Sequence, residues 1–217
     1  MPKCEKTHRC VICGAGPVND AGALGSLLRS QDFIIAADKG LELIERLKLN
    51  PDLIVADFDS LNKSRAMSYQ VPIVELPVRK DDTDTMAAAR LGIERGFKDF
   101  LLLGASGGRL DHTMANFAVM LFLLRHGAQA MLADEKNIVK MVLPGRVVVE
   151  PVENSNLSLL AYAGDVCGLT VRCAQYELEN AVLTPDFPLG VSNGFKNSDN
   201  VEITFAKGVL IIIISKD

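Results

Sequence analysis

The distribution of apolar residues changes along the chain, and in the first 130 residues two patterns alternate. Short, continuous apolar runs are separated by stretches in which apolar residues recur with helical spacing. Continuous apolar runs of this length are typical of strands that are buried on both faces. The runs are CVICG (10–14), FIIAAD (33–38), LIVAD (53–57), PIVELP (72–77) and FLLLGA (100–105).

Three of the intervening stretches have the features of helices. Residues 40–48 repeat apolar positions with helical spacing, residues 83–95 are rich in helix-forming residues, and residues 110–125 form a longer apolar stretch. Gly96 and Gly127 follow the second and third stretches, where glycine commonly ends a helix. Strands that alternate with helices in this way predict a mostly parallel sheet with helices on both faces.

Beyond about residue 130 the helical spacing disappears, and turn-forming sequences such as AGD (163–165) and NG (193–194) become frequent. The β-rich runs between these turns are GRVVVEPV, LSLLAY, GLTVRC, VEITF and GVLIIIIS. This pattern is typical of a compact antiparallel β unit, here a sandwich. We therefore predict an α/β domain over residues 1–130 and an all-β sandwich over residues 131–217.

Composition places the chain among globular proteins, because 48% of its 217 residues are hydrophobic and 23% are charged. The formal net charge is −4 and there is no run of Lys and Arg, so we expect no nucleic-acid partner. The longest strongly apolar run, VLIIII at 209–214, is shorter than the roughly 20 residues that span a bilayer. The first ten residues also lack the apolar core of a secretory signal. We expect a cytoplasmic protein that does not bind a membrane.

The chain has five cysteines, and this odd number argues against a complete disulfide framework. Cys10 and Cys13 form a C-x-x-C, which leaves zinc binding or redox chemistry open. The pair lies in an expected strand, where residues three apart face opposite sides. No second C-x-x-C exists. The pattern therefore favours buried structural thiols.

Acidic residues follow at least four of the expected strands. They are Asp38, Asp57, Asp59, Asp81, Asp82, Asp84 and Asp111. In a parallel sheet the carboxyl ends of the strands lie along one edge, and open α/β sheets bind their ligands at that edge. We therefore expect these acids to gather at the binding site.

The close spacing of Asp57 and Asp59 suggests a bound cation, because two carboxylates held within a few ångströms repel each other. Oxygen ligands without clustered His or Cys suit Mg²⁺, which takes one or two carboxylates together with waters and substrate phosphates. A solvated acidic rim is the simpler interpretation for any single Asp, since Asp is common in caps and turns. The recurrence of acids after successive strands favours a metal site.

A second part of the expected site is the segment GASGG (104–108), which leads into a helix that begins near Arg109. Small residues let backbone N–H groups approach a phosphate, and Arg109 can add a bidentate contact. The same segment can also be a tight turn without a ligand. The segment GAGP (14–17) departs from a dinucleotide fingerprint, because Asn19 stands at the third glycine position, and the chain has no P-loop motif. His112 is a candidate to orient an acid or to cap the helix.

Six short blocks resemble, in their order, the thiamin pyrophosphokinase family, whose members make thiamin diphosphate from thiamin and ATP. The blocks are ADKG (37–40), DFDS (57–60), KDDTD (80–84), GGRLDH (107–112) with Asn116, SN (192–193) and FAKGVLIII (205–213). Each block alone is a modest signal, but their order and the α/β-then-β organisation extend the resemblance over nearly the whole chain. One departure is Ala56, which stands where the family usually has Gly.

The resemblance implies a Rossmann-like N-terminal domain that binds nucleotide and metal, and a C-terminal β-sandwich that binds thiamin. It also implies a homodimer, with each active site formed between the N-terminal domain of one subunit and the C-terminal domain of the other. In the implied reaction the thiamin hydroxyl attacks the β-phosphorus of ATP and AMP leaves, with Mg²⁺ as cofactor. Such a transfer depends on positioning and charge neutralisation rather than on a covalent nucleophile.

The resemblance assigns roles to individual residues. The residues implied to be catalytic and to bind Mg²⁺ with the triphosphate are Asp57, Asp59, Asp81 and Asp84. The residues implied to bind ATP are Asp38, Lys80, Thr83, Gly107, Gly108, Arg109, Asp111 and Asn116. Among them, Thr83 and Arg109 would assist phosphate binding, and Asp111 would support its loop. Ser192 and Asn193 would contact thiamin across the subunit interface.

Two points are left open by the resemblance. The hydroxyl proton is expected to pass to a nearby Asp, and Asp81 or Asp84 is our choice. The chain has no Trp, so the thiamin pocket either has an aromatic wall made by Phe or Tyr or has none.

Two other functions fit many of the same residues. One is a related Mg²⁺-dependent phosphotransferase with another acceptor alcohol, which would differ around Ser192 and Asn193. The other is a nucleotide- or thiamin-binding module without catalysis. The full set of acids argues against the module, because simple binding of an anionic ligand has little need for so many carboxylates.

Overall fold

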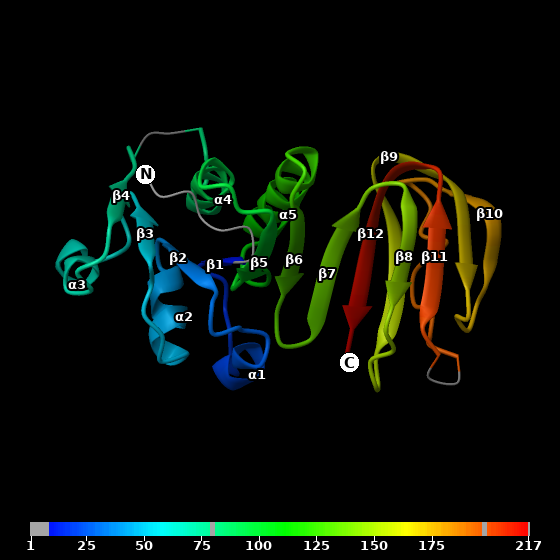
Figure 1. The fold of residues 1–217 in the computed structure, drawn as a ribbon, viewed down its shortest axis with the longest axis horizontal. Coiled ribbons are helices and arrows are strands. Elements are labelled where there is room, and N and C mark those ends of the chain that lie inside the picture. Colours follow the sequence, from blue (N-terminus) through cyan, green and yellow to red (C-terminus); the bar gives the residue numbers. More distant parts are fainter. Residues whose placement is uncertain (1–8, 79–80, 197–198, 217) are drawn as a thin grey trace. The chain divides into compact units, whose positions relative to one another are not determined.

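A computed structural model describes residues 9–78, 81–196 and 199–216 (Figure 1). The chain divides into two compact units, Met1–Glu135 and Lys136–Asp217. Strand pairing over the described chain is mixed, because it is parallel in the first unit and antiparallel in the second. The expected mostly parallel arrangement is therefore limited to the first unit. No helix among the described residues is long and apolar enough to cross a membrane.

The first unit alternates strands and helices, as its apolar pattern predicts. Its strands are β1 (Cys10–Cys13), β2 (Phe33–Ala37), β3 (Leu53–Ala56), β4 (Ile73–Glu75), β5 (Asp99–Leu103) and β6 (Gln129–Ala133). Its helices are α1 (Ala21–Gly25), α2 (Gly40–Arg46), α3 (Lys63–Met67), α4 (Asp84–Glu94) and α5 (Leu110–Arg125). The strands pair in parallel in the order β4-β3-β2-β1-β5-β6.

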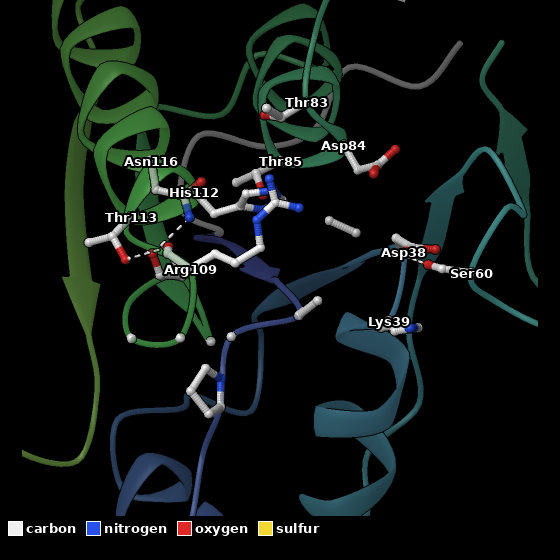
Figure 2. Close-up of a pocket in the computed structure, with 18 of the residues that line it drawn as sticks. Asp38, Lys39, Ser60, Thr83, Asp84, Thr85, Arg109, His112, Thr113 and Asn116 are labelled. Carbon is white, nitrogen blue, oxygen red and sulfur yellow. Dashed lines mark hydrogen bonds between the residues drawn. The ribbon is translucent and has the colours of Figure 1, made fainter. Parts of the chain in front are cut away.

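The order of these strands reverses between β1 and β5. The chain builds the sheet from β1 to β4 in one direction and then returns to the other side of β1 for β5 and β6. Since crossover connections are right-handed, α1 and α2 lie on one face, and α4 and α5 on the other (Figure 1). The connections after β1 and β5 therefore lead to helices on opposite faces of the sheet, and open α/β sheets bind ligands at such a point. A cavity lies at this edge (Figure 2).

Helix α4 packs unusually close to the sheet. Ala87, Ala88 and Ala89 are buried, and a Cβ atom at Gly92 would lie 2.5 Å from the Phe100 ring. Small residues at these positions let the helix cross over the sheet and bring its first turn to the carboxyl edge. This explains why residues 83–95 are rich in alanine instead of large apolar side chains.

The second unit consists of strands, as predicted. They are β7 (Asn137–Val142), β8 (Gly145–Val149), β9 (Asn156–Arg172), β10 (Leu178–Leu183), β11 (Val201–Phe205) and β12 (Lys207–Ser215). They pair in the order β7-β12-β9-β11-β8, and β10 pairs with β9. The pairings among them are antiparallel.

One prediction for this unit is wrong. The segment AGD (163–165) does not form a turn, because β9 continues through it and joins LSLLAY and GLTVRC into one strand. Ala163 and Gly164 have φ angles of 59° and 124°, so the irregularity is absorbed inside the strand. The first part of β9 pairs with β12, and its last part pairs with β10 and β11.

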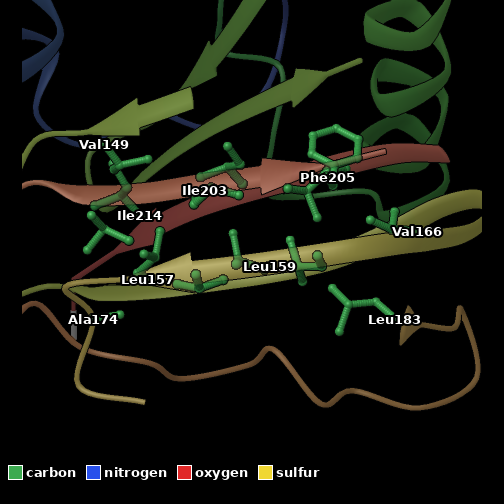
Figure 3. Close-up of a cluster of buried hydrophobic side chains, with 14 residues drawn as sticks. Val149, Leu157, Leu159, Val166, Ala174, Leu183, Ile203, Phe205 and Ile214 are labelled. Atoms are coloured by element: carbon green, nitrogen blue, oxygen red, sulfur yellow. The ribbon is translucent and has the colours of Figure 1, made fainter. Parts of the chain in front are cut away.

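Both parts of β9 contribute to one apolar core (Figure 3). Leu157 and Leu159 from the first part and Leu169 and Val171 from the last part belong to the same buried cluster as Ile203 of β11. The strands of this unit therefore curve around a common core. The long strand gives the unit a continuous frame, along which the segment that contains Ser192 and Asn193 is attached.

Candidate active site

The cavity at the carboxyl edge of the first unit has a volume of about 470 Å³. It is lined by the segments that follow β1, β2, β3 and β5 and by the first turns of α4 and α5 (Figure 2). Most of the predicted ATP-binding residues line it: Asp38, Thr83, Gly107, Gly108, Arg109 and Asn116. Lys80 lies outside the described residues. The parallel sheet thus brings together segments that are far apart in the sequence.

Three carboxylates in this cavity can hold one metal ion. Asp38, Asp57 and Asp59 each offer an oxygen atom, and these atoms lie within 4.8 Å of one another. The Oδ2 atom of Asp38 accepts a short hydrogen bond from Ser60 Oγ. The Oδ1 atom of Asp38 is buried and has no hydrogen-bond partner among the described residues. A buried carboxylate oxygen without a partner is costly, and a cation would remove that cost.

The backbone brings these acids together through two residues with positive φ. Asp38 has a φ of 48° and Phe58 has a φ of 60°, a region that residues other than glycine rarely occupy. The turn at Phe58 lets Asp57 and Asp59 reach the same group, and Asp59 N donates to Asp57 Oδ1 over 3.2 Å. Ala56 is a buried strand residue without positive φ, so this position does not require glycine.

Asp84, the first residue of α4, and Thr83, its N-cap, line the cavity above Asp38 in the view of Figure 2. The Thr83 side chain caps the helix, because its Oγ1 accepts from Met86 N at 3.2 Å. Asp84 lines the cavity but is outside the three-carboxylate group. Asp81 is exposed and does not line the cavity, so its predicted role in metal binding stays a prediction.

Asp82, the remaining acid of this segment, has a structural partner. Its Oδ2 lies 2.8 Å from Arg90 Nε, and the Arg90 guanidinium lies 5.1 Å from the centre of the Phe122 ring. The ion pair links the acidic segment to α4, and the ring contact links α4 to α5. Asp82 is therefore an acid of the same segment that has a structural partner, and its substitution is a control for substitutions of the metal-site acids.

The glycine-rich segment after β5 adopts a conformation that requires glycine. Gly107 and Gly108 have φ angles of 77° and 62° and line the cavity. The GAGP segment packs against this loop, since Gly16 N donates to Gly104 O over 2.7 Å. A Cβ atom at Gly16 would lie 2.6 Å from the same carbonyl oxygen. Close packing between two loops therefore accounts for Gly16 without a dinucleotide.

Arg109 points into the cavity from the residue before α5 (Figure 2). Its Nε and Nη2 donate to Asp111 at 3.1 and 2.5 Å. These bonds raise the pKa of Arg109 and lower the pKa of Asp111. Both side chains are exposed, so the pair contributes little to stability, and the guanidinium can turn to a phosphate. Buried Asn116 supports the loop from below by donating to Ala105 O at 2.7 Å.

His112 also lines the cavity, at the start of α5. Its backbone N–H donates to Asp111 Oδ1 over 3.0 Å, so Asp111 satisfies a donor in the first turn of the helix. Neither suggested role of the His112 ring, orienting an acid or capping the helix, is tested by these contacts, and both stay predictions.

The C-x-x-C thiols lie away from this chemistry, inside β1. Cys10 and Cys13 are free and fully buried. Burial raises the pKa of Cys13 to about 12 and that of Cys10 further. Neutral thiols in an apolar strand are poor metal ligands and poor nucleophiles. The structure supports the structural interpretation over the zinc or redox alternative.

In the second unit, Ser192 and Asn193 are adjacent but have different surroundings. Ser192 is exposed at a φ of 58°, and its N–H donates to Ser158 Oγ over 3.1 Å. Asn193 is 8% exposed, and its side chain bonds to the backbone of Tyr176. The Tyr176 side chain is 63% exposed. The sequence alone did not single out Tyr176, because the absence of Trp left Phe, Tyr or no aromatic residue as the alternatives.

Comparison with known proteins identifies relatives over nearly the whole chain. A family model described as the thiamin pyrophosphokinase catalytic domain matches residues 24–132, and one described as the vitamin B1 binding domain matches residues 146–210. A thiamine pyrophosphokinase of Bacillus subtilis is 28% identical over 210 residues, which cover 95% of this chain and 98% of the relative.

Solved structures show the same relationship. The crystal structure of thiamine pyrophosphokinase from Bacillus subtilis has a TM-score of 0.86 at 25% identity and covers 97% of this chain and 100% of its own. A thiamin pyrophosphokinase family protein from Enterococcus faecalis has a TM-score of 0.77 at 26% identity, with 97% and 99% covered. With both domain matches in order, the chain belongs to the thiamin pyrophosphokinase family, whose enzymes transfer the pyrophosphoryl group of ATP to thiamin.

Proposed function

We propose that the α/β unit binds ATP together with Mg²⁺, and that the β unit binds thiamin for the family's reaction. The observation that carries this proposal is the three-carboxylate group with its unpartnered oxygen, Asp38 Oδ1. An anionic substrate would not by itself be attracted to three carboxylates. A divalent cation between the acids and the phosphates removes this conflict.

The donor set fits Mg²⁺, because it offers carboxylate oxygens and no sulfur or nitrogen ligand. Asp38, Asp57 and Asp59 would hold the ion, and Asp84 would complete the acidic surface from α4. When bound, Mg²⁺ neutralises phosphate charge and orients the transferred group. We keep Asp81 as a proposed contributor from the same acidic segment.

The triphosphate is proposed to lie along the loop before α5. The loop offers backbone N–H groups at Gly107 and Gly108, and the first turn of a 16-residue helix favours an anion. Arg109 would exchange its exposed bond to Asp111 for a phosphate, and Asp111 would hold the guanidinium ready until then. Asn116 would keep the loop in place through its bond to Ala105.

The hydroxyl proton of the acceptor is proposed to pass to a carboxylate in the acidic segment. Of the two expected candidates, Asp84 lines the cavity and Asp81 does not, which favours Asp84. A carboxylate within hydrogen-bond reach of the attacking hydroxyl orients it and accepts its proton as the new bond forms.

Thiamin is proposed to bind at the surface formed by Tyr176 and Ser192. Thiamin carries a positively charged thiazolium ring, and an aromatic face attracts a cation. The exposed Tyr176 ring supplies such a face in a chain without Trp, and Ser192 supplies an exposed hydroxyl.

We further propose that the chain forms a cytoplasmic homodimer whose active sites each combine the N-terminal domain of one subunit with the C-terminal domain of the other. Phe187, Leu189 and Val191 are 63%, 46% and 45% exposed, and apolar side chains gathered in one segment are typical of an interface. The free thiols among the described residues suit a reducing compartment. The proposed domains are a Rossmann-like fold over residues 1–130 and a sandwich over residues 131–217.

Separate binding titrations test this division of roles. A non-hydrolysable ATP analogue should bind the wild type tightly only with Mg²⁺, and Asp59→Asn should weaken this binding at least about 10-fold. Thiamin binding should survive Asp59→Asn and weaken in Tyr176→Ala. Equal affinity for the analogue with and without Mg²⁺, in both wild type and variant, would remove the metal from the proposal.

A further inference from the structure

The side chain of Asn193 is engaged inside the β unit. Its Oδ1 accepts from Tyr176 N at 2.9 Å and from Gly194 N at 2.8 Å. Its Nδ2 donates to Tyr176 O at 2.7 Å. The backbone N and O of Asn193 pair with Leu157 of β9, both at 2.9 Å. Both acceptor positions of the side-chain oxygen are therefore used.

The side-chain amide of Asn193 pairs with the backbone of Tyr176 in the way that a neighbouring strand would. It bonds to both backbone polar groups of Tyr176, whereas the Tyr176 ring is left 63% exposed. Asn193 is itself attached to β9, a strand that belongs to the core of the unit. The exposed ring is thus fixed to the core through one buried amide.

From these contacts we infer that Asn193 is a positioning residue for Tyr176 and not a direct thiamin ligand. The inference rests on the proposed thiamin surface, and it differs from the contact role that the family resemblance implies for Asn193. With 8% of its surface exposed and three of its side-chain bonds made internally, Asn193 has little left to offer a ligand. Ser192 keeps the direct contact.

The hydrogen bonds around Tyr176 show which part of the backbone depends on Asn193. Gln175 N donates to Gly194 O at 2.8 Å, and Ala174 forms a bridge with Phe195, so the segment before Tyr176 is already attached. Beyond Tyr176, Cys173 N donates to Glu177 Oε1 at 2.9 Å, an exposed contact. Asn193 is the buried group that holds the backbone of Tyr176 on both sides.

A double-mutant cycle on the full-length enzyme tests the inference. Asn193→Asp keeps the acceptors for Tyr176 N and Gly194 N but places a carboxylate oxygen against Tyr176 O, and it is nearly isosteric, so the unit should fold. We expect it to raise the KM for thiamin about 10-fold, the scale of one disrupted buried hydrogen bond, with the KM for ATP unchanged. In a Tyr176→Ala background, Asn193→Asp should raise the KM for thiamin by less than about twofold.

Two controls accompany the cycle. Asn200→Asp makes the same change at an exposed residue of this unit and should leave every kinetic constant unchanged. Asn193→Ala removes both bonds to Tyr176, and hydrogen exchange should show a faster Tyr176 amide, whereas the amide of Ile212 in β12 should keep its protection.

The outcomes separate the inference from the function on which it rests. Equal increases in the thiamin KM with and without the Tyr176 ring would make Asn193 a direct ligand and overturn the inference. An unchanged Tyr176 amide in Asn193→Ala would also overturn it. If Tyr176→Ala alone leaves the thiamin KM at the wild-type value, the proposed thiamin surface is wrong, whatever Asn193 does.

Discussion

At the carboxyl edge of the α/β unit, three carboxylates lie close enough to share one metal ion, whereas around Asn193 in the β unit the polar groups are bonded to one another. Asp38 has a buried oxygen without a partner among the described residues. Asn193 uses both sides of its amide on one neighbouring residue. Under the proposed function, the ligands would complete the first region, whereas the hydrogen bonds of the second are already made before a ligand arrives.

This difference follows from the two substrates of the family's reaction. A triphosphate with its metal brings charge and oxygen atoms, so the protein gains by leaving matching positions open. Thiamin brings a positive charge spread over an aromatic ring, so a fixed aromatic surface serves better. The comparison therefore predicts that losses at the first region appear in turnover and in the KM for ATP, and that losses at the second appear in the KM for thiamin.

The largest effect is expected for the carboxylates. Asp57→Asn or Asp59→Asn should reduce turnover at least about 100-fold, because each removes a major charge contact at the phosphates. The melting temperature should not fall, since removing one of several like charges relieves repulsion. Asp82→Asn is the matched control, and its effect on turnover should stay within about threefold because it loses only a surface pair with Arg90. Equal activity of Asp57→Asn, Asp59→Asn and the wild type at saturating Mg²⁺ would exclude both acids from the metal site.

The proposed sharing of sites predicts the next largest effect. Asp57→Asn and the disruptive Asn193→Lys, each nearly inactive at low thiamin, should complement when mixed and refolded. Under random equal mixing half of the dimers are hetero, each with one intact site, so activity should approach about a quarter of wild type. Mixed dimers isolated with two different tags should carry that activity. If tagged heterodimers form and remain as inactive as the parents, each site lies within one chain.

Removal of the aromatic face should give a smaller, more selective effect. Tyr176→Ala should raise the KM for thiamin about 10-fold, which is in the range of a partly desolvated cation–π contact, and should leave the KM for ATP unchanged. Tyr176→Phe keeps the ring and should stay within about twofold of wild type. Steady-state kinetics with each substrate varied in turn measures both constants. If Tyr176→Ala changed the KM for ATP and left the KM for thiamin unchanged, the β unit would not be the thiamin-binding region.

Arg109→Lys should have a moderate effect on the nucleotide side. Lysine keeps the charge but loses the planar pair of donors, so the KM for ATP should rise about fivefold. The thiamin constant should not change, because Arg109 lies in the cavity of the α/β unit. Asp111→Asn should raise the KM for ATP by less, because it only frees the Arg109 guanidinium from its partner. An Arg109→Lys enzyme with wild-type constants would show that the bidentate geometry is not used.

The smallest effect is expected in the free energy of unfolding and comes from Cys13, which is buried in strand β1 of the α/β unit. Burial raises the pKa of Cys13 to about 12 from 9.0, so the folded state keeps a proton that the unfolded chain would lose. The resulting stabilisation is fully present below pH 9 and decreases as the pH rises from 9 towards 12, by up to about 1.4 kcal/mol per pH unit. Chemical unfolding at pH 7 to 10 should show this decrease in the wild type and a smaller one in Cys13→Ala. Identical pH dependence in the two proteins would contradict a strongly perturbed thiol.

Apolar patterning was sufficient to predict most of the α/β unit, because continuous runs in a parallel sheet are a strong signal. It was not sufficient at β9, where AGD has the composition of a turn but Ala163 and Gly164 carry the strand onwards at positive φ. Local propensity cannot distinguish a turn from an irregularity inside a strand when pairing on both sides holds the chain.

The candidate site was predicted in part. The sequence spacing identified Asp57 and Asp59 as a pair, but the third member of the group is Asp38, which the resemblance placed only among ATP-binding residues. Its position depends on a positive φ and on the register of β2 with β3, neither of which is visible in a sequence. Likewise, the link from Asn193 to Tyr176 spans 17 residues and could not be read from local pattern.

The most direct test of the central claim identifies the nucleotide released when the protein is incubated with ATP, Mg²⁺ and thiamin. The acids and the glycine loop suit any metal-dependent phosphotransfer, so the product reports where the acceptor hydroxyl lies along the phosphate chain. We predict AMP and thiamin diphosphate in equal amounts, with both absent when either thiamin or Mg²⁺ is omitted. ADP with thiamin monophosphate, or tight binding of both substrates without turnover, would contradict the account.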